Sequence, residues 1–204
     1  MNMFKYIVSK VCYSIVAGSN YYKINQRNIL AEIAPSSKIS PDTIINNPLN
    51  DSSRIKIGNR CIISDVELVL FGHGGQISIG DECFIGKGTR IWSGKNITIG
   101  NNVLISHNVN IHDNGSHPLN SLERQEDFRH LYNTGKLRES ENFDLKDADV
   151  IIGDNAWLGF NSTISKGVTV GKGAIIGAYS YVTKDVPDFA VVVGNPAKVI
   201  KYTD

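Results

Sequence analysis

An aliphatic residue returns at every sixth position through much of the second half of the chain. The series runs Ile152, Leu158, Ile164, Val170, Ile176 and Val182, and each is followed directly by glycine or another small residue. An α-helix turns through about 600° in six residues, which would scatter these side chains around its axis. Short extended segments joined by tight corners would instead place them all on one inner wall. The period therefore predicts a parallel β-helix, an all-β fold built as a triangular prism.

Two positions of each six-residue unit are expected to point into the shaft of the prism. The first is the aliphatic residue, and the second, four places later, is small or of modest size: Ala156, Ser162, Val168, Ala174, Ser180 and Val186. The glycine after the aliphatic residue is expected at a corner, where it adopts backbone angles that other residues resist.

The same pattern begins earlier in the chain and is interrupted once. Starts at Gly58, Gly80 and Gly100 lie about one coil apart, but the next matching start is Gly153, 53 residues after Gly100. One coil accounts for only about 20 of these 53 residues, so the others must leave the prism. The polar, charge-mixed segment 118–148 has no six-residue phase and is expected to be this excursion, an extended loop of a length that is usually either functional or disordered.

The first 30 residues have a different pattern. Apolar residues from Phe4 to Val16 recur with the spacing of an amphipathic helix. We therefore expect a helical appendage over 1–30 and a β-helix domain over 31–204. This N-terminal helix is too short and too interrupted by lysine to span a bilayer. Packing on the domain or on a neighbouring subunit is expected, and weak attachment to a membrane surface is the alternative.

Charge and cysteine content exclude several classes of protein. The formal net charge of +1 gives no case for a nucleic-acid partner. The three cysteines form an odd number without a CxxC pair, so neither a disulfide framework nor a thiolate zinc site is indicated. A reducing, cytoplasmic location is expected.

Three motifs point to a family. They are "SHPL" (116–119), the repeat region 151–187 and "VVGNPAKVI" (192–200). With these motifs the chain resembles the hexapeptide-repeat acyltransferases, in the branch of maltose, galactoside, sialic-acid and capsule O-acetyltransferases. The resemblance implies a left-handed parallel β-helix, a homotrimer with sites between subunits, and acetyl-CoA as the donor, with no metal required. The acceptor it implies is a hydroxyl of a sugar or surface polysaccharide, and the amine of an amino sugar is the alternative.

Transfer of an acetyl group to a hydroxyl requires a base for the hydroxyl and N–H donors for the oxyanion. His117 matches the catalytic histidine of the family's "HP" motif and is the candidate base. Asp113 is a candidate partner that orients the imidazole, although a loop aspartate that accepts backbone N–H bonds fits the sequence equally well.

The donor side is expected around Trp157, which follows an inward alanine and should point outward. The resemblance places Trp157 beside the thioester, with the backbone amides of Gly159 and Phe160 as oxyanion donors. It also implies contacts with coenzyme A from the Ala178 backbone, Thr183, Lys184, Lys198 and Lys201.

The spacing of the histidines raises another hypothesis. His107, His112 and His117 lie five residues apart, and γ-class carbonic anhydrases, which share the prism, hold zinc with such a pair and a third histidine. His107 and His112 are otherwise expected on the outer surface of the prism. A catalytically inactive scaffold is the non-enzyme alternative.

Overall fold

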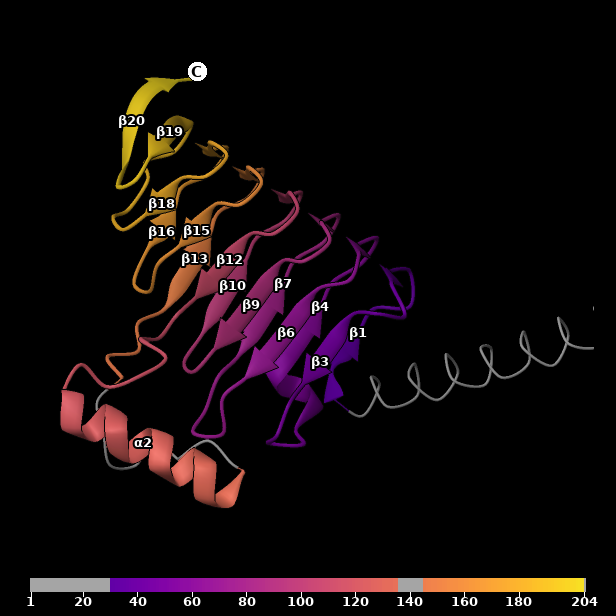
Figure 1. Cartoon of the computed structure of the whole chain (residues 1–204). Helices are drawn as coiled ribbons and strands as arrows, with labels where there is room; N and C mark the ends of the chain where they lie inside the picture. Colours follow the sequence, from indigo (N-terminus) through magenta and orange to yellow (C-terminus); the bar gives the residue numbers. More distant parts are fainter. Residues whose placement is uncertain (1–29, 136–144, 204) are drawn as a thin grey trace, which may run out of the picture.

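The computed structural model describes residues 30–135 and 145–203 (Figure 1). They form a three-sided β-helix with one sheet along each face, which agrees with the left-handed prism that the family resemblance implies. The amphipathic helix expected over 1–30 lies outside the described residues, apart from Leu30.

Sheet A contains six parallel strands: β1 (Glu32–Ile33), β4 (Ile55–Ile57), β7 (Ile77–Ile79), β10 (Ile97–Ile99), β13 (Val150–Ile152) and β16 (Thr169–Val170). Sheet B contains eight: β2 (Lys38–Ile39), β5 (Ile62–Ile63), β8 (Phe84–Ile85), β11 (Leu104–Ile105), β14 (Trp157–Leu158), β17 (Ile175–Ile176), β19 (Ala190–Gly194) and β20 (Ala197–Tyr202). Sheet C contains six: β3 (Ile44–Asn46), β6 (Glu67–Leu70), β9 (Arg90–Ser93), β12 (Asn110–His112), β15 (Thr163–Ile164) and β18 (Tyr181–Val182). A short 3-10 helix, η1 (Ser52–Arg54), precedes β4. All strand pairs are parallel except the β19–β20 hairpin at the C-terminal end.

The excursion leaves the prism without changing its register. Strand β10 pairs directly with β13, so that Ile97 lies beside Val150 and Ile99 beside Ile152. The prediction that the coil resumes at Val150 is confirmed.

The inward positions were also predicted correctly. Every aliphatic residue of the series from Ile152 to Val182 is at most 1% exposed, and the smaller residues from Ala156 to Val186 are at most 4% exposed. Identical slots of successive coils therefore stack into one continuous apolar core.

The reason given for the corner glycines was wrong. Gly153 and Gly159 are not among the residues with positive φ, whereas Asn155 and Asn161, two places later, have φ of 60° and 55°. A Cβ atom on Gly153 would lie 2.7 Å from the backbone nitrogen of Lys172 in the next coil. Glycine is therefore required by the close stacking of coils, and asparagine takes the left-handed corner.

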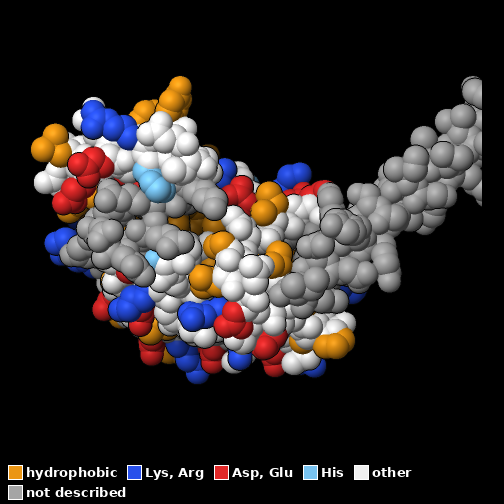
Figure 2. Space-filling model, turned by 90° about the horizontal axis from the view of Figure 1, so that it is seen from below, with side chains coloured by type: hydrophobic (Ala, Val, Ile, Leu, Met, Phe, Trp, Pro, Cys, Tyr) orange, Lys and Arg blue, Asp and Glu red, His pale blue; other side chains and the backbone are white. Residues whose placement is uncertain are grey.

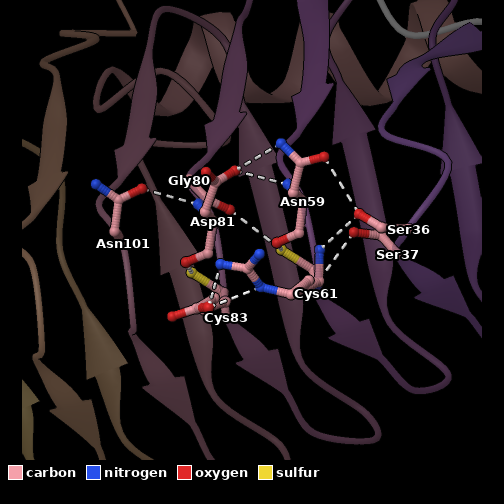
Figure 3. Close-up of polar contacts among 10 residues, drawn as sticks. Ser36, Ser37, Asn59, Cys61, Gly80, Asp81, Cys83 and Asn101 are labelled. Atoms are coloured by element: carbon pink, nitrogen blue, oxygen red, sulfur yellow. Dashed lines mark hydrogen bonds and ion pairs between the residues drawn. The ribbon is translucent and has the colours of Figure 1, made fainter.

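Side chains bridge the coils at the corner that follows sheet A (Figure 3). The Asn59 amide donates to Asp81 Oδ1 at 2.6 Å, the Asp81 amide to Asn101 Oδ1 at 2.8 Å, and the Asn101 amide to Asp154 Oδ1 at 2.7 Å. Each of these corner amides is thus satisfied by the equivalent side chain of the next coil. Beside this ladder the thiols of Cys61 and Cys83 fill inward slots and donate to carbonyl oxygens.

The excursion is more ordered than the expected loop. It contains the helix α2 (Ser121–Thr134), which projects from the prism (Figure 1). The Asn120 side chain accepts from the backbone N–H groups of Leu122 and Glu123, and Gly135 ends the helix in a left-handed conformation. No helix in the described part of the chain is long and apolar enough to cross a membrane.

Candidate active site

His117 is paired with a carboxylate from helix α2. Its Nδ1 atom lies 3.0 Å from Asp127 Oδ2, and the side chains are 59% and 10% exposed, respectively. An ionised carboxylate only accepts hydrogen bonds, so this contact favours the tautomer with the proton on Nδ1. The Nε2 lone pair is then available to accept a proton, which is the arrangement of a general base.

Local hydrogen bonds fix the turn that carries His117. Asn114 accepts from the Ser116 amide at 2.8 Å, and Ser116 adopts a positive φ of 61°. After the histidine, the guanidinium of Arg124 donates to the carbonyl oxygens of Pro118 and Leu119 at 3.0 and 2.7 Å. The "SHPL" segment is therefore held on both sides of the imidazole.

Asp113 accepts backbone N–H bonds, as the second sequence-based expectation had it, but from a buried position. It is fully buried, and its carboxylate accepts from the Ser93 hydroxyl at 2.6 Å and from the Gly94 and Lys95 amides at 2.7 and 2.9 Å. It is therefore neither the partner of His117 nor an exposed loop residue. The sequence reasoning missed Asp127, because the segment containing it was expected to be a loop.

The other histidines have separate partners. His107 stacks on Phe160 with ring centroids 5.1 Å apart, and His112 stacks on Trp92 at 5.2 Å. His112 was expected on the outer surface, but its side chain is half-buried. Its Nε2 atom is buried and has no hydrogen-bond partner among the described residues, and burial lowers its pKa. Within residues 30–135 and 145–203 no three histidine, cysteine or acidic side chains are grouped as metal ligands. The three histidines of the zinc hypothesis are thus not brought together within one chain.

An open groove of about 590 Å³ lies beside the candidate base. It is lined by His117, Ser121, Leu122, Arg124, Gln125 and Phe128. Figure 2 views the molecule from below Figure 1, the side on which α2 lies, and shows apolar side chains exposed close to acidic and basic ones. None of the expected donor-side residues lines the groove.

Trp157 points outward, as expected. It is 48% exposed on β14, and its Nε1 donates to the Ser106 hydroxyl at 3.4 Å. It lies in register between Leu104 of β11 and Ile175 of β17.

The two proposed oxyanion amides differ in their availability. The Gly159 amide donates to the Ile176 carbonyl at 2.8 Å and is used by the sheet. Neither the Phe160 amide nor the Ala178 amide of the next coil donates a hydrogen bond within the described residues. These two corner amides, after β14 and β17, therefore remain available as backbone donors for a ligand.

The remaining donor-side residues lie toward the C-terminal end. Ala178 and Thr183 flank strand β18, and Lys184 follows directly; all three are exposed. Lys198 and Lys201 are exposed on β20. A second hollow of about 290 Å³ includes Tyr181 of β18, together with Asn110, His112, Asn114, Thr163, Ile164, Ser165 and Lys166.

Comparison with known proteins agrees with this architecture. Residues 149–184 match the bacterial transferase hexapeptide (six repeats), and residues 76–112 match the hexapeptide repeat of succinyl-transferase. A Staphylococcus aureus (strain COL) protein, provisionally described as an acetyltransferase, is 38% identical over 89 residues, which are 44% of this chain and 37% of that protein. The chain therefore matches less than half the length of this relative.

Two solved structures cover more of the chain. A hexapeptide-repeat acetyltransferase from Vibrio cholerae O1 biovar eltor, in complex with acetyl coenzyme A, is 28% identical with a TM-score of 0.56, covering 72% of this chain and 70% of that one. A maltose O-acetyltransferase from Clostridium difficile 630 is 29% identical with a TM-score of 0.52, covering 72% and 69%. The chain is thus similar to hexapeptide-repeat transferases in its fold and in the repeats of residues 76–112 and 149–184. The resemblance to the hexapeptide-repeat acyltransferases is thereby confirmed.

Proposed function

We propose that this protein is an acetyl-CoA-dependent O-acetyltransferase that acts on a hydroxyl of a sugar or surface polysaccharide. The observation that carries the proposal is the His117–Asp127 pair, which leaves Nε2 of an exposed imidazole beside an open groove and without a partner among the described residues. The acetyl-CoA complex of the Vibrio cholerae relative supports the choice of donor. Because acetyl-CoA is a metabolite of the cytoplasm, we place the reaction there.

The reaction follows from the chemistry of the pair. Nε2 of His117 takes the proton of the acceptor hydroxyl as its oxygen attacks the thioester carbonyl. Asp127 stabilises the imidazolium that forms, and the Phe160 amide donates to the oxyanion of the tetrahedral intermediate. Collapse of the intermediate expels the coenzyme A thiolate, which receives the proton from His117. The base is thereby restored, and the products are the acetyl ester and free coenzyme A.

The donor side of each site is proposed to come from a neighbouring subunit of a homotrimer. The groove beside His117 contains no donor-side residue. Sheet B also exposes a row of large apolar side chains in register across four coils: Ile62, Phe84, Leu104 and Trp157. Exposed apolar rows of this kind mark contact surfaces. A neighbouring prism would cover this row and bring Trp157 and Ala178 to the partner's histidine.

An acceptor screen tests the proposed activity. Purified protein with acetyl-CoA is offered matched pairs of sugars and amino sugars, as monosaccharides and as oligosaccharides, while free thiol release and product mass are measured. Ester formation on hydroxyls supports the proposal, whereas transfer to amines alone would replace it with N-acetylation. Protein that neither binds nor consumes acetyl-CoA would show that it is a scaffold.

His117→Ala is the matched variant for the base. We expect turnover to fall by about 10²–10⁴-fold, the usual contribution of general-base catalysis, with coenzyme A affinity unchanged. His112→Ala should cost far less. Equal losses in the two variants, or recovery of either variant on addition of zinc, would contradict the assignment of His117 as the single base.

A further inference from the structure

Helix α2 is attached to the prism in an unusual way. A surface helix normally buries an apolar stripe, but the buried residue of α2 is Asp127, the partner of His117. The large apolar side chains of the helix are exposed instead: Leu122 by 70%, Phe128 by 64% and Tyr132 by 81%. They therefore contribute little to the core of this chain and remain available for a ligand.

Two of these side chains form an aromatic pair beside the candidate base. Phe128 follows Asp127 directly and lines the same groove as His117. Tyr132 lies one helical turn further along, with ring centroids 6.3 Å apart and an angle of 33° between the planes. The pair extends from the groove toward its outside, because Tyr132 is not among the residues that line it.

Polar groups complete the groove. The Gln125 side chain and the Ser121 hydroxyl line it, and neither has a hydrogen bond within the described residues. A few polar groups beside an aromatic face are typical of sites that orient small ligands. A pyranose ring has this combination, with an apolar C–H face and a rim of hydroxyls. A purely aliphatic ligand would leave the polar groups unused.

We propose that α2 is the element that recognises the acceptor, and that the Phe128–Tyr132 pair stacks on consecutive rings of an oligosaccharide. Phe128 holds the ring that reacts, with Gln125 and Ser121 on its hydroxyls and one hydroxyl facing Nε2 of His117. Tyr132, outside the groove, holds the next ring. The acceptor is therefore a saccharide of two or more units rather than a monosaccharide. This inference deepens the proposed function and rests on it.

The test compares three variants on acceptors of increasing length, chosen from those that the wild-type protein acetylates. Phe128→Ala should raise the acceptor KM about three- to tenfold for every length, the scale of one aromatic contact. Tyr132→Ala should raise it only for acceptors of two or more units. Leu131 lies on the same helix, is 39% exposed and does not line the groove, so Leu131→Ala should leave the acceptor KM unchanged for every length. The KM for acetyl-CoA should stay constant in all three.

The outcomes separate the inference from the activity on which it rests. If the wild-type protein transfers acetyl groups but Phe128→Ala leaves the acceptor KM unchanged, the proposed stacking on Phe128 and Tyr132 is wrong, while the proposed acetyltransferase activity is not contradicted. Loss of assembly in Phe128→Ala, measured as mass in solution, would assign the aromatic pair to a subunit contact instead. Wild-type protein that acetylates no saccharide would refute the proposed function itself, and the stacking proposal with it. Restoration of the KM by Phe128→Trp would confirm stacking, since tryptophan keeps an aromatic face.

Discussion

Two aspartates that lie near His117 in the sequence have different surroundings in the structure. Asp113 is buried and holds the backbone of residues 93–95, whereas Asp127 lies on an exposed helix and contacts the imidazole. Their positions predict that one residue affects stability and the other affects turnover.

Substitution to asparagine separates these roles. Asp127→Asn keeps the shape but removes the charge that holds the His117 tautomer, so we expect turnover to fall by about 10²-fold with an unchanged melting temperature. Asp113→Asn leaves donors without a charged acceptor and should destabilise the fold by about 1–3 kcal/mol. Both variants are measured by thermal unfolding and by thiol release. A stable, inactive Asp113→Asn protein would reverse the assignment.

We expect His112 to make the stability of the fold depend on pH. Burial lowers its pKa, while Asp113 opposes this shift and Arg90 adds to it. The unfolded chain, with a pKa near 6.5, then binds a proton more readily than the folded chain. The folded state is therefore favoured by the neutral form of His112. Its full stability is present above the pKa of the unfolded chain and is lost progressively as the pH falls toward the lower pKa of the folded chain.

His112→Phe should remove this dependence, because phenylalanine can still stack on Trp92. We expect the melting temperature of the wild-type protein to fall relative to that of the variant between pH 7 and pH 5. The difference between the two proteins isolates the contribution of His112, because every other side chain is the same in both. A difference that stays constant over this range would contradict the prediction.

At the scale of secondary-structure elements, the excursion is an addition to a prism that is complete without it. Its C-terminal end is the exception, because the Lys166 ammonium donates to the Leu145 carbonyl oxygen at 3.1 Å and Asp147 contacts His73 at 2.9 Å. Residues 145–148 therefore pack on the coils, and α2 projects beyond them.

Replacement of residues 120–143 by a short Gly-Ser linker tests this division. The β10–β13 register depends on Val150 and Ile152 and should persist. The β-sheet signal in circular dichroism and the coenzyme A affinity should therefore remain those of the wild-type protein, while the helical signal of α2 is lost. Acetyl transfer should be lost, since Asp127 and Phe128 are removed together. A linker protein that unfolds would show that α2 is part of the structural core.

The sequence revealed the elements that repeat and missed those that depend on distant contacts. The inward slots were predictable because each six-residue unit carries its own signal, as at Ile164 and Ser162. The contact of Asp127 with His117 was not, because it requires a helix to fold back on its own entry turn. The role of Gly153 also depends on the next coil, whose backbone nitrogen at Lys172 leaves no room for a Cβ atom.

At the scale of the whole molecule, one prism holds only part of the proposed site. His117 and its groove lie at the excursion, while Trp157 and Ala178 lie on the coils after it and line no part of that groove. The exposed apolar row of sheet B ends at Trp157. A cyclic trimer repeats one kind of interface three times. In such a trimer the apolar row on sheet B of each chain would be covered by one neighbouring chain.

Mixed trimers test whether each site is shared. Ala178 is exposed, so Ala178→Trp should disable the donor side without disturbing the fold. If one subunit supplies His117 and its neighbour the donor side, random mixing with His117→Ala should restore about one quarter of the sites, because each site then draws independently from both parents. The measurement is turnover after the two inactive proteins are unfolded and refolded together, with each refolded alone as a control. A fully active monomer, or mixed trimers without turnover, would refute the shared site.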